Sequence, residues 1–202
     1  MKKIYLTVSA AARRRAISLI EGVLYLVIAL AVIVGGIVFF QQSQMSSNIT
    51  DTARAMSGIA AQTRSLYQNQ RTFDADLITP SLIKAGAVPS TFVGGTEGAA
   101  DGTIRHPFNG EISVYGNGPD RFVITLSSLP QEACLRMGVV GPDGSGPLGT
   151  GILAMIANED STALVYDGDL TDEPGYMEPP FAPEDMADIC DDDWDLSVYY
   201  AR

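Results

Sequence analysis

One apolar stretch near the N-terminus constrains this chain more than any other feature. Residues Ile17–Phe40 form a run of 24 residues whose only charged member is Glu21. A helix needs about 20 apolar residues to cross a bilayer, and this run exceeds that length. An ordinary secretory signal has a shorter apolar core, of about 7–15 residues, followed by a cleavage site with small residues. We therefore expect a membrane-spanning helix over residues 17–40.

The charges on the two sides of this run have opposite signs. The chain has 13 basic and 24 acidic residues, and its first 16 residues contain five of the basic residues and no acidic one. The remaining 8 basic and 24 acidic residues give the rest of the chain a net charge of −16. Basic residues beside a first apolar segment stay cytoplasmic, so we expect the acidic part on the far side of the membrane. Because so acidic a surface repels phosphate, nucleic acid is not an expected partner.

Glu21 is the unusual residue of the apolar run. A carboxylate inside a membrane segment is energetically costly, and for this reason such a residue is usually functional. A glutamate near the helix end, with its carboxylate reaching the membrane surface, is the alternative interpretation. The chain is accordingly either a plain single-pass anchor or a precursor whose N-terminal leader is removed.

The segment Arg13–Gly22, with the sequence Arg-Arg-Arg-Ala-Ile-Ser-Leu-Ile-Glu-Gly, resembles the processing site of type IV prepilins. The resemblance implies that residues 1–16 are a leader, which a prepilin peptidase removes between Ala16 and Ile17. It also implies N-methylation of Ile17 and identifies Glu21 as the signature acid, fifth in the mature chain. Ala16 departs from the family pattern, in which glycine is usual, and we expect slower processing at alanine.

Physical reasoning gives Glu21 a role in assembly. Cleavage leaves a charged amine on Ile17, at the start of an apolar helix. In a dry bundle of helices this amine needs a partner of opposite charge. Glu21 of a neighbouring subunit can supply that charge, so the pair favours assembly.

Helical periodicity continues beyond the membrane segment. Small and apolar residues recur at spacings of three or four as far as Tyr67, and no proline occurs between positions 17 and 79. We predict one helix from Ser18 to Gln70, with an amphipathic second half that can bury one face against a head domain. The expected organisation is a leader (1–16), an N-terminal helix (17–70) and a globular head (71–202).

The head consists of short segments separated by glycine and proline. The predicted strands are Glu111–Tyr115, Phe122–Leu126, Thr162–Tyr166 and Leu196–Ala201, and a turn at 116–120 joins the first two into a hairpin. The predicted short helices are Thr79–Gly86, with Thr79 as N-cap, Pro130–Met137, ended by Gly138, and Pro183–Cys190. The fold class is therefore α+β, a long N-terminal helix packed on a small antiparallel sheet of about four strands.

Three segments of the head resemble the type IVb pilins of conjugative and enteric systems, namely Leu77–Pro89, Ile104–Glu111 and Leu129–Cys134. The resemblance implies the pilin fold and a structural subunit that polymerises with itself into an extracellular filament for adhesion, aggregation or conjugation. Its implied partners are the prepilin peptidase and the inner-membrane assembly machinery. The subunit would wait in the bacterial inner membrane with a periplasmic C-terminus. Two alternatives remain, a pseudopilin of a type II secretion system and a membrane-anchored binding or sensor domain that does not polymerise.

The two cysteines, Cys134 and Cys190, both lie in the exported part of the chain. An oxidising compartment and an even number of cysteines favour one disulfide over two free thiols. Two thiols 56 positions apart lack the paired spacing of a zinc site, and only His106 could join them. We expect a disulfide and no metal.

The residues of the head do not predict catalysis or a cofactor. His106 is the only histidine, and the sequence has no Gly-x-Ser-x-Gly motif, so we expect a structural histidine in a loop. Acidic residues could still bind calcium, and solvated acidic surface is the favoured interpretation. The two candidate groups are Asp188, Asp191, Asp192, Asp193 and Asp195, and Asp167, Asp169 and Glu178, where Asp172 stands in place of a turn glycine.

Overall fold

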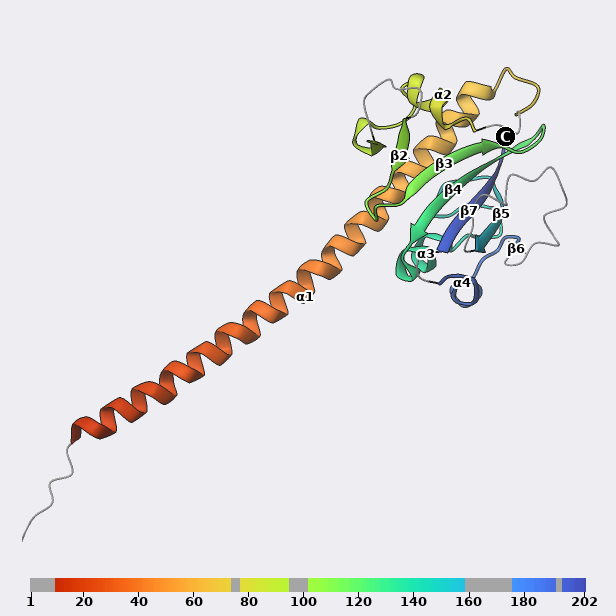
Figure 1. The fold of residues 1–202 in the computed structure, drawn as a ribbon. Coiled ribbons are helices and arrows are strands. Elements are labelled where there is room, and N and C mark those ends of the chain that lie inside the picture. Colours follow the sequence, from red (N-terminus) through yellow and green to blue (C-terminus); the bar gives the residue numbers. More distant parts are fainter. Residues whose placement is uncertain (1–9, 74–76, 95–101, 159–175, 192–193) are drawn as a thin grey trace, which may run out of the picture. The chain divides into compact units, whose positions relative to one another are not determined.

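The computed structural model describes residues 10–73, 77–94, 102–158, 176–191 and 194–202, with side chains from Leu19 onward. The chain divides into two compact units, Met1–Met45 and Ser46–Arg202. Helix α1, Ala10–Tyr67, contributes residues to both units (Figure 1). The prediction of one long helix over Ser18–Gln70 is confirmed, although α1 begins eight residues earlier and ends three residues earlier than predicted.

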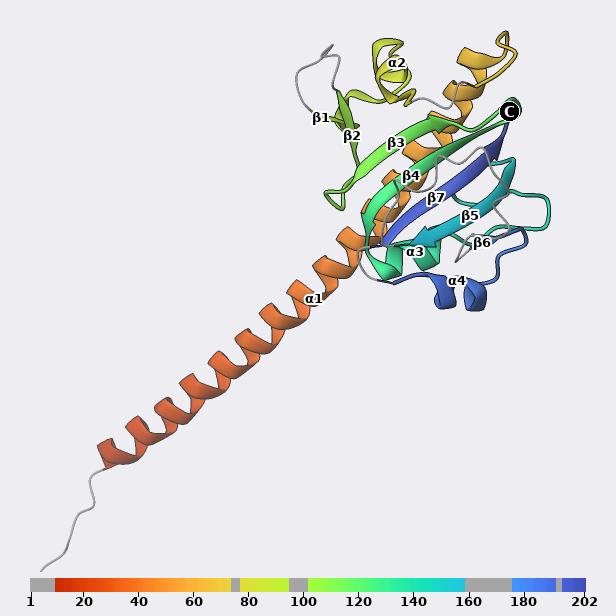
Figure 2. The same ribbon diagram turned by 45° about the vertical axis from the view of Figure 1, so that its right-hand side comes forward.

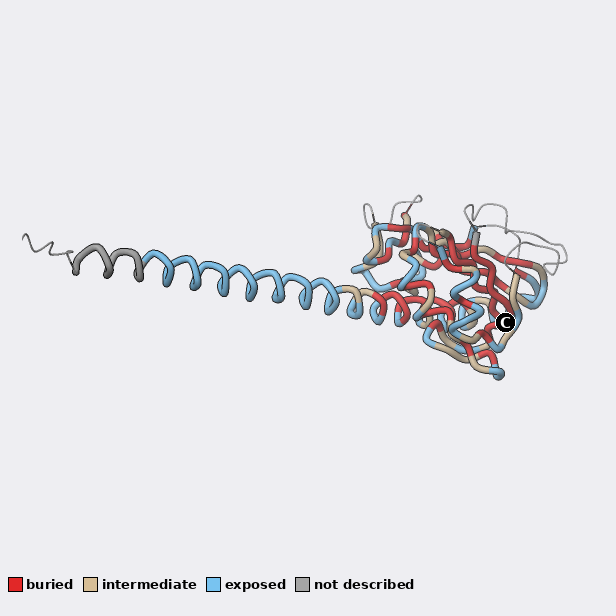
Figure 3. The backbone as a smooth tube through the Cα atoms, turned by 90° about the horizontal axis from the view of Figure 1, so that it is seen from below, coloured by how far each residue is buried: buried red, intermediate tan, exposed pale blue. Residues whose placement is uncertain are grey.

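The first unit consists of the apolar part of α1. Every described side chain from Leu19 to Gln44 is exposed within the chain, as the tube of Figure 3 shows. By length and composition, the described part of this helix could cross a membrane.

In the second unit, α1 is amphipathic as predicted. The residues that it buries recur every three or four positions, among them Ile49, Met56, Ile59 and Thr63. The buried hydroxyl of Thr63 donates to the Ile59 carbonyl at 2.8 Å, so it adds no unsatisfied polar group. Residues 46–67 thus provide one apolar face for the head.

The head contains a sheet of seven antiparallel strands in the order β1-β2-β3-β4-β7-β5-β6 (Figures 1 and 2). The strands are β1 (Val93–Gly94), β2 (Thr103–Arg105), β3 (Glu111–Gly116), β4 (Arg121–Leu129), β5 (Ile152–Asn158), β6 (Tyr176–Met177) and β7 (Trp194–Ala201). The prediction of about four strands was therefore too low, because the three shortest strands and β5 gave no strand signal. The predicted strand Thr162–Tyr166 lies outside the described residues.

The central strands confirm the predicted hairpin and the predicted strand Leu196–Ala201. Strands β3 and β4 form the predicted hairpin, with Val114 opposite Ile124. Strand β7 pairs with β4 on one side and β5 on the other. All residues of β7 from Asp195 to Tyr200 are buried, which is expected of a central strand covered on both faces.

Aromatic and aliphatic side chains fill both faces of this sheet. On one face Phe122 stacks on Tyr200, with 5.3 Å between ring centroids, and Phe73 packs beside Phe122. On the other face Val123 and Tyr199 belong to a separate buried cluster. Successive side chains of β4 and β7 point to opposite faces of the sheet, so these two strands contribute to a buried core on each face.

Three short helices lie outside the sheet, α2 (Thr79–Lys84), α3 (Gln131–Met137) and α4 (Pro183–Ile189). The prediction that Thr79 is the N-cap of α2 was wrong, because Ile78 occupies that position. The Thr79 hydroxyl instead accepts a hydrogen bond from the Val114 backbone N–H at 2.8 Å and so ties α2 to β3. Helix α3 ends at Gly138, as predicted.

Candidate functional site

Glu21 lies on the exposed apolar part of α1. Its carboxylate accepts a hydrogen bond from the Tyr25 hydroxyl one turn later, with 3.4 Å between the oxygens. The large apolar side chains on this part of the helix expose more than half of their surface, between 52% for Ile28 and 75% for Phe39. The unit thus carries one carboxylate on an apolar surface that no described residue covers.

Ala16 and Ile17 lie within α1, and their side chains fall outside the described part of the structure. Leader cleavage between them and N-methylation of Ile17 therefore stay predictions. Glu21 follows Ile17 by four positions in the same helix.

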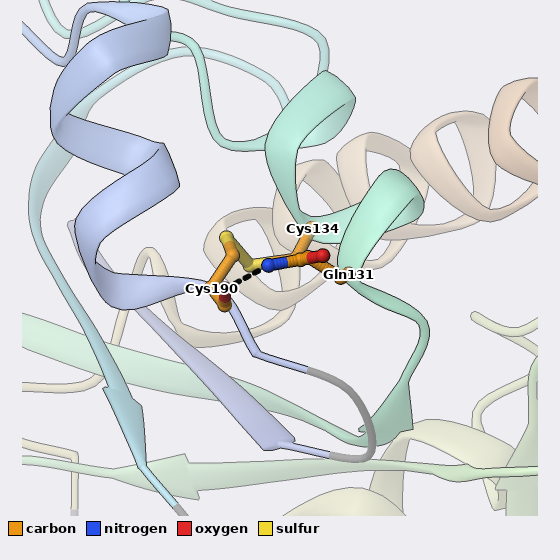
Figure 4. The surroundings of a disulfide bond; sticks show 3 residues. All are labelled: Gln131, Cys134 and Cys190. Carbon is orange, nitrogen blue, oxygen red and sulfur yellow. Dashed lines mark hydrogen bonds between the residues drawn. A yellow bond between two sulfur atoms is a disulfide. The ribbon is translucent and has the colours of Figure 1, made fainter.

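Cys134 and Cys190 form a disulfide bond that joins α3 to the end of α4, with 5.9 Å between their Cα atoms (Figure 4). Both cysteines are buried, each with 3% of its surface exposed. The Gln131 side-chain amide donates to the Cys190 carbonyl at 3.0 Å, which fixes the backbone beside the bridge. Gly138 allows the close contact of the two helices, because a Cβ at this position would overlap the Met186 side chain.

His106 is buried at the end of β2 and holds the loop that leads into β3. Its Nε2 lies 2.9 Å from the Ser127 carbonyl oxygen, and its Nδ1 accepts from the Phe108 backbone N–H. These partners require the neutral tautomer with the proton on Nε2. Burial lowers the pKa of His106 below its ordinary value of 6.5, although Ser127 and Asp195 oppose the shift. The structural role that we predicted for this histidine is confirmed.

Two arginines hold the head together in ways that sequence analysis missed. The Arg64 guanidinium donates to the carbonyls of Ala201 and Thr150, at 2.9 and 2.6 Å. It also lies 5.7 Å from the centroid of the Phe122 ring and 5.5 Å from that of the Tyr200 ring. Arg64 therefore joins α1 to β7.

Arg202 follows Ala201 in the chain and contacts the C-terminal end of α1. Its guanidinium donates to the carbonyls of Tyr67 and Gln68, each at 3.2 Å, and also to those of Gln70 and Arg71. The last carbonyls of a helix lack intrahelical partners and carry partial negative charge, so a cation is favourable there. Arg202 thus caps the end of α1.

Two of the acidic residues that suggested calcium, Asp195 and Glu178, form hydrogen bonds within the head. The Asp195 carboxylate accepts from the Ser128 backbone N–H at 2.9 Å, where Ser128 adopts a left-handed φ of 51°. Glu178 accepts a hydrogen bond from the Tyr176 hydroxyl at 2.7 Å. No group of three potential ligands comes together among the described residues. Asp167, Asp169, Asp172, Asp192 and Asp193 lie outside the described residues.

Comparisons with known proteins agree with this architecture. Residues 46–146 match the family described as "PilS N terminal". The chain is 28% identical over 128 residues to the major structural subunit of the bundle-forming pilus of Escherichia coli O127:H6 (strain E2348/69 / EPEC) and to that of Escherichia coli O111:H-. Each match covers 61% of this chain and 63% of the relative, so the chain spans less than two thirds of the length of these relatives.

A solved structure has the same fold. The crystal structure of a type IV b pilin from Salmonella typhi matches with a TM-score of 0.51 and 18% sequence identity, over 73% of this chain and 96% of that chain. At this identity the likeness shows the fold alone, and it confirms the predicted α+β pilin fold. The family match covers half of the chain. The chain therefore belongs to the PilS N-terminal family of type IV pilins.

Proposed function

We propose that this chain is a structural subunit of a type IV pilus and polymerises with other copies of itself through the apolar part of α1. One observation carries the proposal. Residues 19–44 form a helix with every side chain exposed, and Glu21 is the only charged residue between Ile17 and Phe40. Exposed apolar surface on this scale needs a lipid or protein environment. A membrane supplies that environment first, and a bundle of identical helices supplies it in the filament.

The proposed path begins in the bacterial inner membrane. The subunit crosses the membrane once through residues 17–40, with the basic leader in the cytoplasm and the head in the periplasm. The prepilin peptidase removes residues 1–16, Ile17 is N-methylated, and the inner-membrane assembly machinery adds the subunit to an extracellular filament. The resemblance of Arg13–Gly22 to prepilin processing sites supports these steps.

Glu21 has a specific role in this proposal. The amine of Ile17 becomes a charged group at the start of an apolar helix, and Glu21 of a neighbouring subunit neutralises it. An apolar bundle of helices has few other groups that could neutralise this amine. The charge pair would therefore set the axial position of one helix beside the next.

The head serves as the outer surface of the filament in this proposal and has no catalytic role. The relatives are structural subunits of a bundle-forming pilus, which supports adhesion or aggregation as the use of the filament, with conjugation as a third possible use. A pseudopilin would share the processing site, and a membrane-anchored sensor would share the span without cleavage.

Two measurements on one strain test the proposal. Electron microscopy of sheared cell-surface material should show filaments that disappear when the gene for this chain is deleted. Mass spectrometry of the purified filament subunit should give a chain that begins at Ile17 with one added methyl group. A subunit that begins at Met1, or cells without filaments, would contradict the proposal and favour the anchored domain.

A further inference from the structure

A cleft of about 610 Å³ opens on the head beside α1. Residues from three separate parts of the sequence line it, with Arg54 on α1, Phe92 in the 3₁₀ turn Ser90–Phe92, and Arg105 and His106 at the end of β2. The cleft therefore combines an apolar wall with two guanidinium groups.

The positive charge of the cleft contrasts with the rest of the exported chain. Among the described residues that line the cleft, Asp51 is the one acid, and its carboxylate lies 3.8 Å from the Arg54 guanidinium. The side chains of Arg54 and Asp51 are 78% and 50% exposed, so this ion pair is weak. Arg105 forms no ion pair with any of the residues that the structure describes. Both arginines therefore remain able to bind an anionic partner.

Contacts of Arg105 and His106 with neighbouring strands hold one wall of the cleft in place. A Cβ at Gly94 of β1 would lie 3.3 Å from Cδ and Nε of Arg105, so this glycine gives the arginine side chain room to lie across the strand. The neighbouring His106 is anchored through the Ser127 carbonyl. Arg54 on α1 and Arg105 on β2 both stand on regular elements, which keep the geometry of a site better than a loop does.

Another part of the head presents a complementary surface. Helix α4 carries Glu184 and Asp188 one turn apart, and both side chains are exposed. Residues at this spacing lie on one face of a helix. Neither carboxylate forms an ion pair with a described residue. The acidic face of α4, formed by Glu184 and Asp188, thus offers two carboxylates where the cleft offers two guanidinium groups.

We propose that the cleft binds the acidic face of α4 from a second copy of this chain, with Arg54 and Arg105 pairing with Glu184 and Asp188. The inference rests on the proposed function, because a filament brings many copies together. Heads with a strongly acidic surface repel one another unless charges of opposite sign meet locally. Paired guanidinium and carboxylate groups also fix the orientation of the contact.

The symmetry of this contact suits a filament. It joins two different surfaces, so each head still has a free cleft on one side and a free acidic face on the other. Such a heterologous contact continues indefinitely when it does not close into a ring, and it then generates a helical polymer. A self-complementary contact would stop at a dimer.

Charge reversal tests the pairing in cells that express the full chain. R54E/R105E and E184R/D188R should each lower the yield of sheared filaments about tenfold, whereas the chain with all four substitutions should recover most of the wild-type yield. The variant K84E/R136E lowers the net charge by the same amount as R54E/R105E, at exposed positions outside the cleft. It should leave the filament yield unchanged. Disulfide formation and protease resistance of the membrane-held subunit show whether each variant folds.

Three further variants give independent readouts. D51N removes the acid from the cleft, so its filaments should withstand more salt than wild-type filaments, and those of R105Q should withstand less. In R105K filaments a zero-length carbodiimide reagent should link the new amine to Glu184 or Asp188 of another subunit, which gives a dimer on a denaturing gel and a cross-linked peptide by mass spectrometry.

The outcomes separate this inference from the function on which it rests. Absence of filaments from the wild-type chain would overturn both. Wild-type filaments together with a full yield from R54E/R105E would overturn this inference alone. A loss that the fourfold substitution does not restore would also overturn it, and would favour a small anionic ligand in the cleft.

Discussion

At the scale of single residues, Arg64 supplies polar and aromatic contacts between α1 and the sheet. Replacing it in R64M keeps the apolar stem and removes two hydrogen bonds to backbone carbonyls as well as the contacts with two aromatic rings. We expect the free energy of unfolding to fall by about 2 kcal/mol, since hydrogen bonds to charged groups are stronger than neutral ones. Urea denaturation of the detergent-solubilised chain measures this loss.

The matched control is R136M on α3. Arg136 forms an exposed ion pair with Glu132 one turn away, at 2.7 Å, and such surface pairs contribute little. Equal unfolding midpoints for R64M and R136M would show that Arg64 does not support the fold.

His106 gives the head a predictable dependence on pH. Because its pKa is lowered in the folded chain, the unfolded chain binds more protons at and below pH 6.5. The stability from the neutral imidazole is therefore present above pH 6.5 and is lost as the pH falls toward the folded pKa. His106 is the only histidine, so no other side chain has an ordinary pKa in this range.

We expect the free energy of unfolding to decrease between pH 7 and pH 5, and the variant H106Q to show a smaller decrease. Glutamine keeps a donor for the Ser127 carbonyl and does not titrate. Denaturation curves at several pH values provide the measurement, and equal pH profiles for the two proteins would rule out His106 as the cause.

Sequence analysis found some of these residues and missed others for physical reasons. His106 is the only histidine, the two cysteines were expected in an oxidising compartment, and Glu21 is the only charge in an apolar run. Arg64 and Arg202 had no comparable signal, because their acceptors are backbone carbonyls more than 80 positions away in sequence. A backbone carbonyl is present at every residue, so the sequence does not mark which one an arginine will bind.

At the scale of elements, the disulfide between α3 and α4 closes a loop with a sequence separation of 56. In the chain-entropy model, closing a loop of this length stabilises the folded state by about 4 kcal/mol. We expect C134A/C190A to unfold at a clearly lower temperature and to yield few filaments. Calorimetry in detergent and counts of sheared filaments are the two measurements. A variant with the wild-type melting temperature would contradict this expectation.

The elements that sequence analysis predicted are those with local signals. The turn at 116–120 defined the hairpin of β3 and β4, and Gly138 marked the end of α3. Strand β5 was missed because almost all of its residues are apolar, and such a run has no alternation to distinguish a strand from a buried helix. Strands β1 and β6 have two residues each and exist only through pairing with their neighbours.

At the scale of the whole molecule, the decisive substitution is E21A. We expect leader removal to continue, because the proposed cleavage site at Ala16 and Ile17 is unchanged, and we expect filaments to fall to about a tenth or less of the wild-type yield. The neighbour's amine would lose its only proposed partner in an apolar bundle. Immunoblots of the cleaved fraction and the yield of sheared filaments measure the two effects separately.

Y25F provides the control for this substitution. It removes the hydroxyl that donates to Glu21 within the same helix and leaves the carboxylate in place. Its filament yield should stay near that of the wild type. Normal filaments from E21A would mean that Glu21 does not drive docking, and loss of cleavage would assign it to recognition by the peptidase.

The position of β7 in the sheet has a consequence for the order of events during synthesis. Ribosomes make residues 194–201 after every other strand, yet this strand lies between β4 and β5. Strands β1–β4 and strands β5 and β6 emerge earlier, and they cannot join into one sheet until β7 is present. Contacts between residues so distant in sequence also make folding slow. In the proposed function, a subunit whose synthesis stops before residue 194 would expose unpaired strand edges, and proteases could remove it before it reached a filament.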